Sequence, residues 1–454
     1  MNDNAAPRRP RVGAIFVHDF DRVALDARPE AEFDRAGFDL FRFPSQMALA
    51  TFDIDRFVAQ QIRRGRRRRW QGVFSAHEQY GALAAALIAE GLGLPGTDPR
   101  AILAAQHKAH ARTVLARVAP HATLAHQVLP NPLGQAVSED RIRDLPFPIY
   151  VKPVKAAFSV LARRIDDARQ LREHLRFNAW ERYLIRRLTI PFEQVRRRLL
   201  PEAGSSHAVL IETPVDPEVS QYNLDGYVQH GQVQAIGVVD AVMYPGTQAF
   251  MRWDVPSRLA PEVQARALET AARFLNAIGF QHGLFNLEFF YDARSDRITV
   301  IECNPRMASQ FSDLYRRILG LDLHRLALRL ALGAPGKDTP RDPPTAAVAS
   351  SLVFRSFPGD TVPPPPSHSQ RAALMKRFPN ALLFAMPKRE AGRRRDYAWT
   401  GSHRYGLLHL GASDWQHFEA QAREASQLLG WPDLSTIGGF LARPPCVVGS
   451  NAGA

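Results

Sequence analysis

The segment from Gly283 to Arg306, GLFNLEFFYDARSDRITVIECNPR, constrains the fold more than any other part of the chain. Two runs that alternate apolar and polar residues flank the polar stretch ARSDR, a pattern typical of an antiparallel hairpin. Residues two apart in a strand project from the same face. Asn286 and Glu288 are therefore expected to share one face of the first strand.

A hairpin symmetric about Ser295 would place Glu288 opposite Glu302 and Asn286 opposite Asn304. The other face would then carry four apolar side chains into the core: Leu287, Phe289, Ile301 and Cys303. A one-residue bulge would shift this register, and the sequence does not exclude one. In the symmetric register two carboxylates and two carboxamides meet on one face.

Facing carboxylates repel unless a cation, a proton or an arginine offsets them. Oxygen-only ligands suit Mg²⁺, which commonly takes one or two carboxylates together with substrate phosphates. The alternative is a solvated polar face of a two-sided sheet with ordinary cross-strand pairs. Arg306 directly after the second strand favours the metal site, because a guanidinium held there suits a phosphate or carboxylate.

The length of 454 residues predicts two or three domains. No apolar run approaches the roughly 20 residues that cross a bilayer. The apolar stretch VGAIFV near the N-terminus is too short for a signal peptide, and two cysteines give neither a disulfide framework nor a zinc motif. We therefore expect a cytoplasmic protein without a membrane partner.

A formal charge of +13 raises the question of nucleic-acid binding. The arginine runs at 63–69, 196–198 and 393–395 lack interleaved aromatic residues and match no DNA- or RNA-binding motif. Only six of the 58 basic residues are lysines: Lys108, Lys152, Lys155, Lys337, Lys376 and Lys388. An arginine-rich solvated surface explains the charge, with attraction of anionic substrates as its functional counterpart, and no specific nucleic-acid partner is expected.

Residues 11–105 alternate between strand and helix patterns, which predicts a parallel sheet. We expect a strand at VGAIFVHD, a weak helix near 27–35, a second strand at GFDLFRFP, a helix from Ile54 and a third strand into Ser75. The Ala-rich stretch GALAAALIAEGLG predicts a further helix. Loops after parallel strands line clefts, so Glu78 in SAHEQYG is a candidate cleft residue. The first strand lacks a GxGxxG motif.

Residues 101–118 predict one amphipathic helix with Lys108 and Arg112 on one face. PIYVKP predicts a strand with Lys152 at its end, and HAVLIETPVD predicts a strand that ends near Glu212. Residues 166–200 read as basic helices. We also expect a hairpin turning at His230-Gly231 and helices at 261–278 and 319–333.

A Pro-rich break at 338–345 precedes the C-terminal region. That region contains the strand patterns ASSLVFRSF, ALLFAM and YGLLHLG and a helix pattern near 414–429. It predicts a small β-containing appendage.

Taken together, these motifs resemble the ATP-grasp superfamily, in particular its carboxylate-amine ligase and biotin-carboxylase-like branch. ECNPR resembles the family's usual E-[IV]-N-P-R, and NLEFF resembles its partner strand. The similarity runs in order from about 75 to 335. It includes GLGLPGTDPRAILAAQHKAHAR, VKPVKAAFSV and LIETPVDPEVSQYNLDGYV. The loop after Lys152 is commonly Gly-rich in the family, whereas here it contains no glycine.

The resemblance implies four ATP-binding residues. Lys108 would contact ATP from its helix, and Lys152 would contact a phosphate or the adenine ring. Glu212 would meet the adenine amino group and Glu218 the ribose hydroxyls. The Glu218 assignment requires a spacing one residue shorter than the usual pattern.

The resemblance also implies the metal and substrate sites. Mg²⁺, with Mn²⁺ as a substitute, would be held by Glu288, Glu302 and Asn304. Arg306 would be catalytic by steadying an acyl phosphate or the substrate carboxylate. Apart from the resemblance, the loop position of Glu78 and the strand alternation at Asn286 make these two residues candidates to line the cleft.

The expected architecture has three parts. A Rossmann-like parallel-sheet domain would span residues 1–105. An ATP-grasp domain of two subdomains would span 106–337, with a hinge near 212–218. The Pro-rich linker and appendage would span 338–454.

The implied activity is an ADP-forming ligase that joins a small carboxylate to an amine through an acyl phosphate. A biotin-dependent-type carboxylase subunit and a nucleotide-binding regulatory protein without ligase activity stay open as alternatives. The sequence also leaves a homo-oligomer open.

Overall fold

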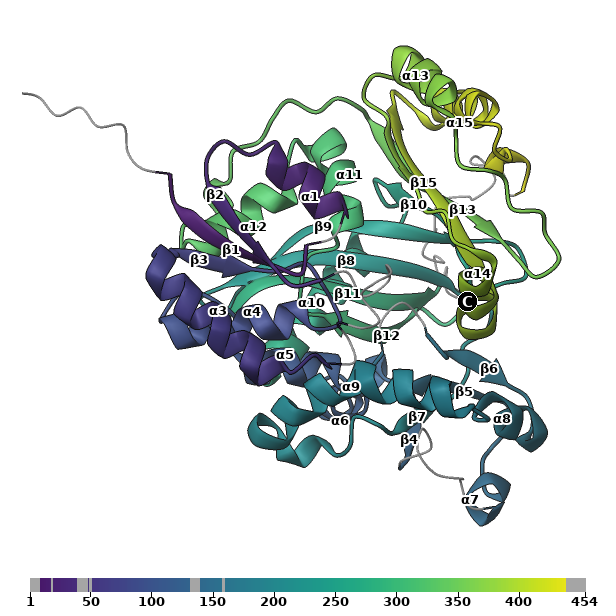
Figure 1. Cartoon of the computed structure of the whole chain (residues 1–454). Helices are drawn as coiled ribbons and strands as arrows, with labels where there is room; N and C mark the ends of the chain where they lie inside the picture. Colours follow the sequence, from purple (N-terminus) through teal and green to yellow (C-terminus); the bar gives the residue numbers. More distant parts are fainter. Residues whose placement is uncertain are drawn as a thin grey trace, which may run out of the picture.

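The computed structural model describes residues 9–17, 19–38, 48, 51–130, 139–156 and 160–437. Three sheets and their surrounding helices make up this part of the chain (Figure 1). None of the described helices has the length and apolarity that a membrane crossing requires.

The N-terminal unit is a parallel sheet of three strands in the order β2-β1-β3, as the alternating pattern predicts. Its strands are β1 (Arg11–Ile15), β2 (Glu32–Ala36) and β3 (Gly72–Phe74). The helices in this part of the chain are α1 (Asp19–Asp26), α3 (Ile54–Arg68), α4 (Gly81–Leu92) and α5 (Pro99–Gln106).

The predictions of a helix near 27–35 and a strand at GFDLFRFP are wrong in placement. The helix is α1, which ends at Asp26, and the strand is β2, which begins at Glu32. Residues 37–38 lie outside any strand, and 39–44 lie outside the described residues. Pairing with β1 and a 2.6 Å hydrogen bond from Trp70 Nε1 to Asp34 hold β2 extended despite its polar sequence.

The single helix predicted over 101–118 is also wrong. His107 adopts an extended conformation with φ −85° and ψ 92°, so the segment divides into α5 and α6 (Lys108–Val118). The His107 ring nitrogen accepts a hydrogen bond from the backbone of His110 and caps the second helix. Lys108 is therefore the first residue of α6.

A four-stranded antiparallel sheet in the order β4-β7-β5-β6 follows. Its strands are β4 (His126–Leu129), β5 (Ile149–Pro153), β6 (Arg163–Ile165) and β7 (Val209–Glu212). The accompanying helices are α7 (Glu139–Arg143), α8 (Ala168–His174) and α9 (Ala179–Leu199). The strand predictions that end at Lys152 and Glu212 are confirmed, and these two strands lie side by side.

The largest sheet has eight strands in the order β12-β11-β8-β9-β10-β13-β15-β14. Its first five are β8 (Ser220–Gln229), β9 (Gln232–Met243), β10 (Phe250–Val255), β11 (His282–Asp292) and β12 (Arg297–Asn304). The turn predicted at His230-Gly231 is confirmed, with both residues at positive φ. Flanking helices are α10 (Pro261–Ala277), α11 (Ser309–Leu319), which the sequence reading missed, and α12 (Leu323–Ala331).

The C-terminal region adds its strands to the edge of this same sheet (Figure 1). These are β13 (Val348–Ser356), β14 (Leu382–Ala385) and β15 (His403–Ala412). The helices here are α13 (His368–Arg377), α14 (Glu390–Thr400) and α15 (Trp415–Leu429). Because β13 pairs with β10, the region is continuous with the strands that carry the acidic hairpin.

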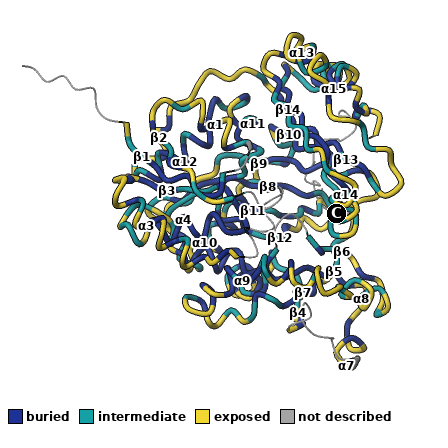
Figure 2. Tube along the Cα trace, in the orientation of Figure 1, coloured by how far each residue is buried: buried dark blue, intermediate teal, exposed yellow. Residues whose placement is uncertain are grey.

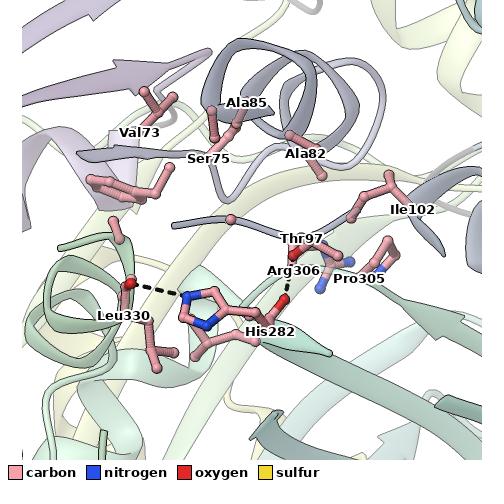
Figure 3. A pocket seen from close by; sticks show the side chains of 18 of the residues that line it. Val73, Ser75, Ala82, Ala85, Thr97, Ile102, His282, Pro305, Arg306 and Leu330 are labelled. Carbon is pink, nitrogen blue, oxygen red and sulfur yellow. Dashed lines mark hydrogen bonds between the residues drawn. The ribbon is translucent and has the colours of Figure 1, made fainter. Parts of the chain in front are cut away.

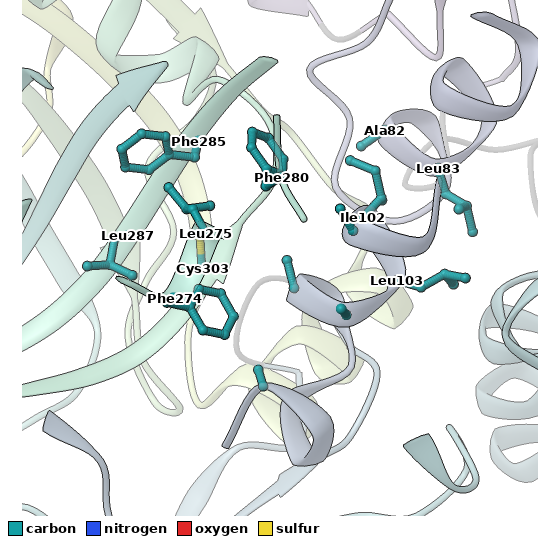
Figure 4. Packing of buried hydrophobic residues seen from close by; sticks show 14 of the residues in the cluster. Ala82, Leu83, Ile102, Leu103, Phe274, Leu275, Phe280, Phe285, Leu287 and Cys303 are labelled. Carbon is teal, nitrogen blue, oxygen red and sulfur yellow. The ribbon is translucent and has the colours of Figure 1, made fainter. Parts of the chain in front are cut away.

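Figure 2 shows that β8, an inner strand of the large sheet, is buried along most of its length. The buried side chains of this sheet fall into two sets, one on each of its faces. Leu287 and Cys303 face the cluster that contains Phe274 and Leu275 of α10 and the apolar residues of α4 and α5 (Figure 4). Val239 and Tyr315 lie in another cluster with Leu314 of α11. With its apolar face buried against helices, the hairpin turns its polar face toward the other side of the sheet.

Candidate active site

The predicted facing pairs on the acidic hairpin are confirmed. Glu288 pairs with Glu302, and Asn286 pairs with Asn304. The hairpin is not symmetric throughout, because at the turn Asp292 pairs with Arg297, which is one residue out of the predicted register. A bulge between Glu288 and Phe289 restores the predicted pairing at the carboxylates.

Ile301 is the extra residue at this bulge, and the prediction that it enters the core is wrong. Phe289 pairs with Val300 and Glu288 with Glu302, which leaves Ile301 half-buried between them. Its carbonyl oxygen instead accepts hydrogen bonds from Arg112 at 3.0 Å and from Lys152 at 3.4 Å. The bulge thus directs the backbone carbonyl of Ile301 toward the side chains of Arg112 and Lys152.

Amide side chains bind the carboxylate of Glu288. Asn304 donates to one oxygen at 3.0 Å, and Gln221 donates to the other at 3.2 Å. Burial and the neighbouring Glu302 raise the pKa of Glu288 to about 8. The facing carboxylates of Glu288 and Glu302 therefore form a site that a bound cation would stabilise.

A deeper polar layer lies beneath these groups. Asn286 donates to Asp225 at 3.0 Å, and the Tyr315 hydroxyl donates to the other oxygen of that carboxylate at 2.8 Å. Burial raises the pKa of Asp225 to about 7. Asn286, which is 2% exposed, belongs to this buried layer beneath Glu288.

Lys108 reaches the acidic hairpin from the start of α6. Its ammonium lies 2.8 Å from Glu302 and donates to the Ala156 carbonyl at 2.8 Å. Its backbone N–H also donates to Val154, so the helix start is tied to the chain that leaves β5. Burial would lower the pKa of Lys108, but Glu302 outweighs it and raises the value.

Glu212 and Lys152 meet as a buried ion pair between β7 and β5, with 2.8 Å between nitrogen and oxygen. The other oxygen of Glu212 accepts from Arg112, a residue that sequence reasoning placed on the face of Lys108 without giving it a role. Arg112 also donates to the carbonyls of Val300 and Ile301. These contacts join the small antiparallel sheet, α6 and the acidic hairpin.

Glu78 and Arg306 connect the N-terminal unit to the same place. Their side chains form an ion pair at 2.8 Å. Gln106 donates to Glu78, and the Lys155 ammonium lies 3.4 Å from the Glu78 carbonyl and 4.9 Å from the Phe192 ring. Burial lowers the pKa of Lys155 to about 8. Sequence reasoning missed Lys155, although the scarcity of lysine was a signal that could have found it.

Glu218 lies apart from this cluster. Its side chain is 82% exposed and pairs at 3.7 Å with Arg294 in the turn of the acidic hairpin. Among the described contacts none joins it to Lys108, Lys152 or Glu212. The structure therefore does not bring this candidate together with the others.

A mostly apolar pocket lies behind Arg306, between β3, α4 and the start of β11 (Figure 3). His282 lines it, and its ring bonds the Leu330 carbonyl at 3.0 Å while its own carbonyl accepts from Thr97. The ring contact secures α12 against β11, which is a structural use of this histidine.

The polar face of the acidic hairpin offers hard oxygen donors for a cation. Glu288, Glu302 and Asn304 supply two carboxylates and an amide on adjacent strands. Within the described residues no group of three His, Cys, Asp or Glu side chains gathers to hold a metal. This set fits a cation such as Mg²⁺ that completes its shell with phosphate oxygens and water.

Comparisons with known proteins agree with this arrangement. Residues 145–313 match the family model described as ATP-grasp domain. The uncharacterized protein y4rH of Sinorhizobium fredii is 26% identical over 354 residues, covering 76% of this chain and 66% of that protein. Human carnosine synthase 1 is 29% identical over 297 residues, covering 61% of this chain and 32% of the synthase. The chain thus matches about a third of the synthase and just under two thirds of y4rH.

Among solved structures, an L-amino acid ligase from Bacillus licheniformis superposes with a TM-score of 0.63 at 16% identity. The superposition covers 92% of this chain and 98% of the ligase. At this identity the likeness establishes the fold.

Proposed function

Because this chain carries an ATP-grasp domain in an ATP-grasp fold, we propose that it is an ATP- and divalent-cation-dependent ligase. It would activate a small carboxylate as an acyl phosphate and join it to an amine, releasing ADP and phosphate. The names of the relatives, an amino acid ligase and a carnosine synthase, support this class of substrate.

One observation carries the proposal. Two lysines from separate elements meet at the acidic hairpin. Lys108 lies 2.8 Å from Glu302 of the hairpin, and Lys152 lies 2.8 Å from Glu212 of β7 and 3.4 Å from the Ile301 carbonyl of the hairpin. Phosphoryl transfer needs positioning and neutralisation of charge more than covalent participation by the protein. These two cations, next to the facing pair Glu288 and Glu302, would meet both needs.

The residues would divide the work between ATP and the substrates. Lys108 and Lys152 would neutralise the phosphates, and Glu212 with Arg112 would hold Lys152 in place. The adenine contact first expected of Glu212 stays a prediction, since both of its oxygens already pair with cations. A divalent cation, when bound by Glu288, Glu302 and Asn304, would supply further neutralisation at the phosphates.

Arg306 would hold the substrate carboxylate or the acyl phosphate, positioned by its pair with Glu78. The carboxylate oxygen would attack the terminal phosphorus of ATP, and ADP would leave. The amine nitrogen would then form a bond to the acyl carbon as phosphate departs, and the amine would lose a proton to solvent or a nearby base. Each group would act by position and charge.

The test compares substrate-dependent ADP release by wild type, Glu302→Gln and Glu269→Gln. Glu269 is an exposed residue of α10 and serves as the matched control. A panel of amino acids, dipeptides and bicarbonate would be offered in pairs with an amine. We expect Glu302→Gln to reduce ADP release at least about a hundredfold while the control retains it.

The other outcomes separate the alternatives. ADP release that depends on bicarbonate would identify the carboxylase. ATP binding without release on any pair would identify a regulatory nucleotide-binding protein. Undiminished release by Glu302→Gln would exclude the proposed use of the acidic hairpin.

A further inference from the structure

A second cavity lies in the C-terminal region, away from the proposed ligase site. Its volume is about 570 Å³, within the range of sites that bind small molecules. Tyr405 and Trp431 on its wall belong to the buried cluster that contains Val242 and Phe354. The acidic hairpin turns its polar side to the other face of the sheet, which holds Val239 and Tyr315. The two sites are therefore distinct.

The wall of this cavity is aromatic and proline-rich. Tyr397 of α14, Tyr405 of β15, Trp431 and the run Pro363–Pro365 all line it. Flat rings and prolines offer surfaces on which a planar apolar body can stack. The occupant that suits this wall is an aromatic ring.

One cation that lines the same cavity lacks a carboxylate partner among the described ion pairs. Lys388, Arg393 and Arg394 line the cavity with Asp360 and Glu390, and Lys388 already pairs with Asp396 at 2.9 Å. Arg394 already pairs with Glu390. Arg393 donates to the Lys388 carbonyl, and among the described ion pairs it has no carboxylate partner. A half-buried arginine without a carboxylate partner is suited to bind the carboxylate of a ligand.

Two buried ring nitrogens on lining residues have no hydrogen-bond partner in the described part of the chain. They are Nε2 of His403 and Nε1 of Trp431. His403 is fully buried, and its other nitrogen lies 2.8 Å from Asp396. A buried polar group without a partner costs about 1–3 kcal/mol, which a ligand that bonds it would recover.

We propose that this cavity binds a small aromatic carboxylate. The carboxylate would pair with Arg393 and accept from Trp431, the ring would stack among Tyr397 and Tyr405, and a polar group on the ring would meet His403. The combination of unpaired cation, aromatic wall and orphaned ring nitrogens selects this class over a purely apolar or a phosphate ligand.

The position of α14 connects the site to the small antiparallel sheet that carries Lys152. The Ala398 carbonyl accepts from Arg163 at 3.0 Å, and the Trp399 carbonyl accepts from the backbone N–H of Leu161 at 3.0 Å. Leu161 lies between β5 and β6, in the chain that leaves Lys152. A ligand that steadies α14 would steady this connection.

Binding is measured on the full chain by isothermal titration calorimetry without ATP. The probes are 4-hydroxybenzoate and indole-3-acetate, and their neutral amides are the matched controls. We expect the acids to bind more tightly than the amides. Arg393→Ala should weaken the acids about ten- to a hundredfold, and Trp431→Phe about two- to tenfold. Arg389→Ala removes an exposed arginine just before α14 that does not line the cavity, and it should leave binding unchanged.

A second measurement separates this cavity from the ligase site and does not depend on turnover. Hydrogen exchange of the Leu161 amide should slow when either acid binds. Arg306→Ala should leave the binding of both acids unchanged. The proposal is wrong if neither acid binds at millimolar concentration, if acids and amides bind alike, or if Arg306→Ala abolishes binding while Arg393→Ala does not.

Discussion

Replacing Glu212 by glutamine would leave two buried cations without their shared carboxylate. Glu212 is 3% exposed, and its oxygens pair separately with Arg112 and Lys152, which are similarly buried. Glutamine has nearly the same shape, so the change removes charge with little loss of packing. Arg112 keeps the carbonyls of Val300 and Ile301 as acceptors, whereas Lys152 keeps a single long contact to Ile301.

Two arguments give the size of the effect. Burial alone would raise the pKa of Glu212, but Lys152 and Arg112 outweigh it and lower the value to about 2. Against the ordinary value of 4.5, this corresponds to about 3 kcal/mol in favour of the charged form. Removing one partner of a buried ion pair costs about 3–5 kcal/mol. We expect Glu212→Gln to lose about 3 kcal/mol of unfolding free energy at pH 7.

The predicted stability difference between wild type and Glu212→Gln depends on pH. A depressed carboxyl pKa stabilises the folded state above pH 4.5, and this contribution is lost as the pH falls toward 2. Glutamine has no such titration. The difference between wild type and Glu212→Gln should therefore be largest at pH 7 and shrink as the pH is lowered below 4.5.

Urea unfolding followed by circular dichroism at pH 7 and pH 3.5 measures both quantities. Glu269→Gln, on the exposed face of α10, should change stability by less than about 1 kcal/mol at either pH. Adding Lys152→Met to Glu212→Gln should recover part of the loss, because it removes one unpaired cation. A loss below about 1 kcal/mol at pH 7, or a loss that is the same at both pH values, would refute the reasoning.

Three further changes test other parts of the cleft. Asp225 has a raised pKa of about 7 against an ordinary 3.8, so its contribution is present at low pH and lost as the pH rises through 7. In urea unfolding, wild type should lose up to about 4 kcal/mol of unfolding free energy between pH 4 and pH 8, and Asp225→Asn should keep it. A pH profile of stability that is the same in Asp225→Asn as in wild type would contradict this. If Lys155, with a lowered pKa of about 8, acts as a cation, ADP release should decline above pH 8, and Lys155→Arg should shift that decline to higher pH. If the decline stays at the same pH in Lys155→Arg, a group other than Lys155 causes it. Glu78→Gln frees Arg306 from its 2.8 Å pair and should raise the KM of the carboxylate substrate more than the KM of ATP, whereas equal changes would argue against that contact.

The acidic hairpin shows how much of the site is local. Alternation along each strand is enough to place Glu288 and Asn286 together, because the pleat sends every second side chain to one face. The opposition of Glu288 and Glu302 requires both the turn and the bulge to be known, and each departs from the symmetric prediction by one residue. These departures compensate, so the pairing was predicted correctly although the geometry that produces it was not.

The bulge itself could not be derived from the hairpin sequence. Arg112 and Lys152 donate to the Ile301 carbonyl at this bulge, and they lie 189 and 149 positions away along the chain. The break before Lys108 also has a distant partner, because the backbone N–H of Lys108 donates to the Val154 carbonyl although an unbroken helix pattern runs through His107. Local propensity carries no information about partners so distant, which is why the fold class was predictable and the ion pairs were not.

Lysine scarcity nevertheless holds information about the cleft. Arg112 uses its planar fork to bind one carboxylate and two carbonyls at once, which fixes its orientation. Lys108, Lys152 and Lys155 instead present single point charges on flexible stems. A point charge with one or two such contacts can turn toward a phosphate more easily than a guanidinium held by three acceptors. Under the proposed function, three of the six lysines therefore lie where charge would be redirected when ATP binds, and Arg112 lies where its contacts join separate elements.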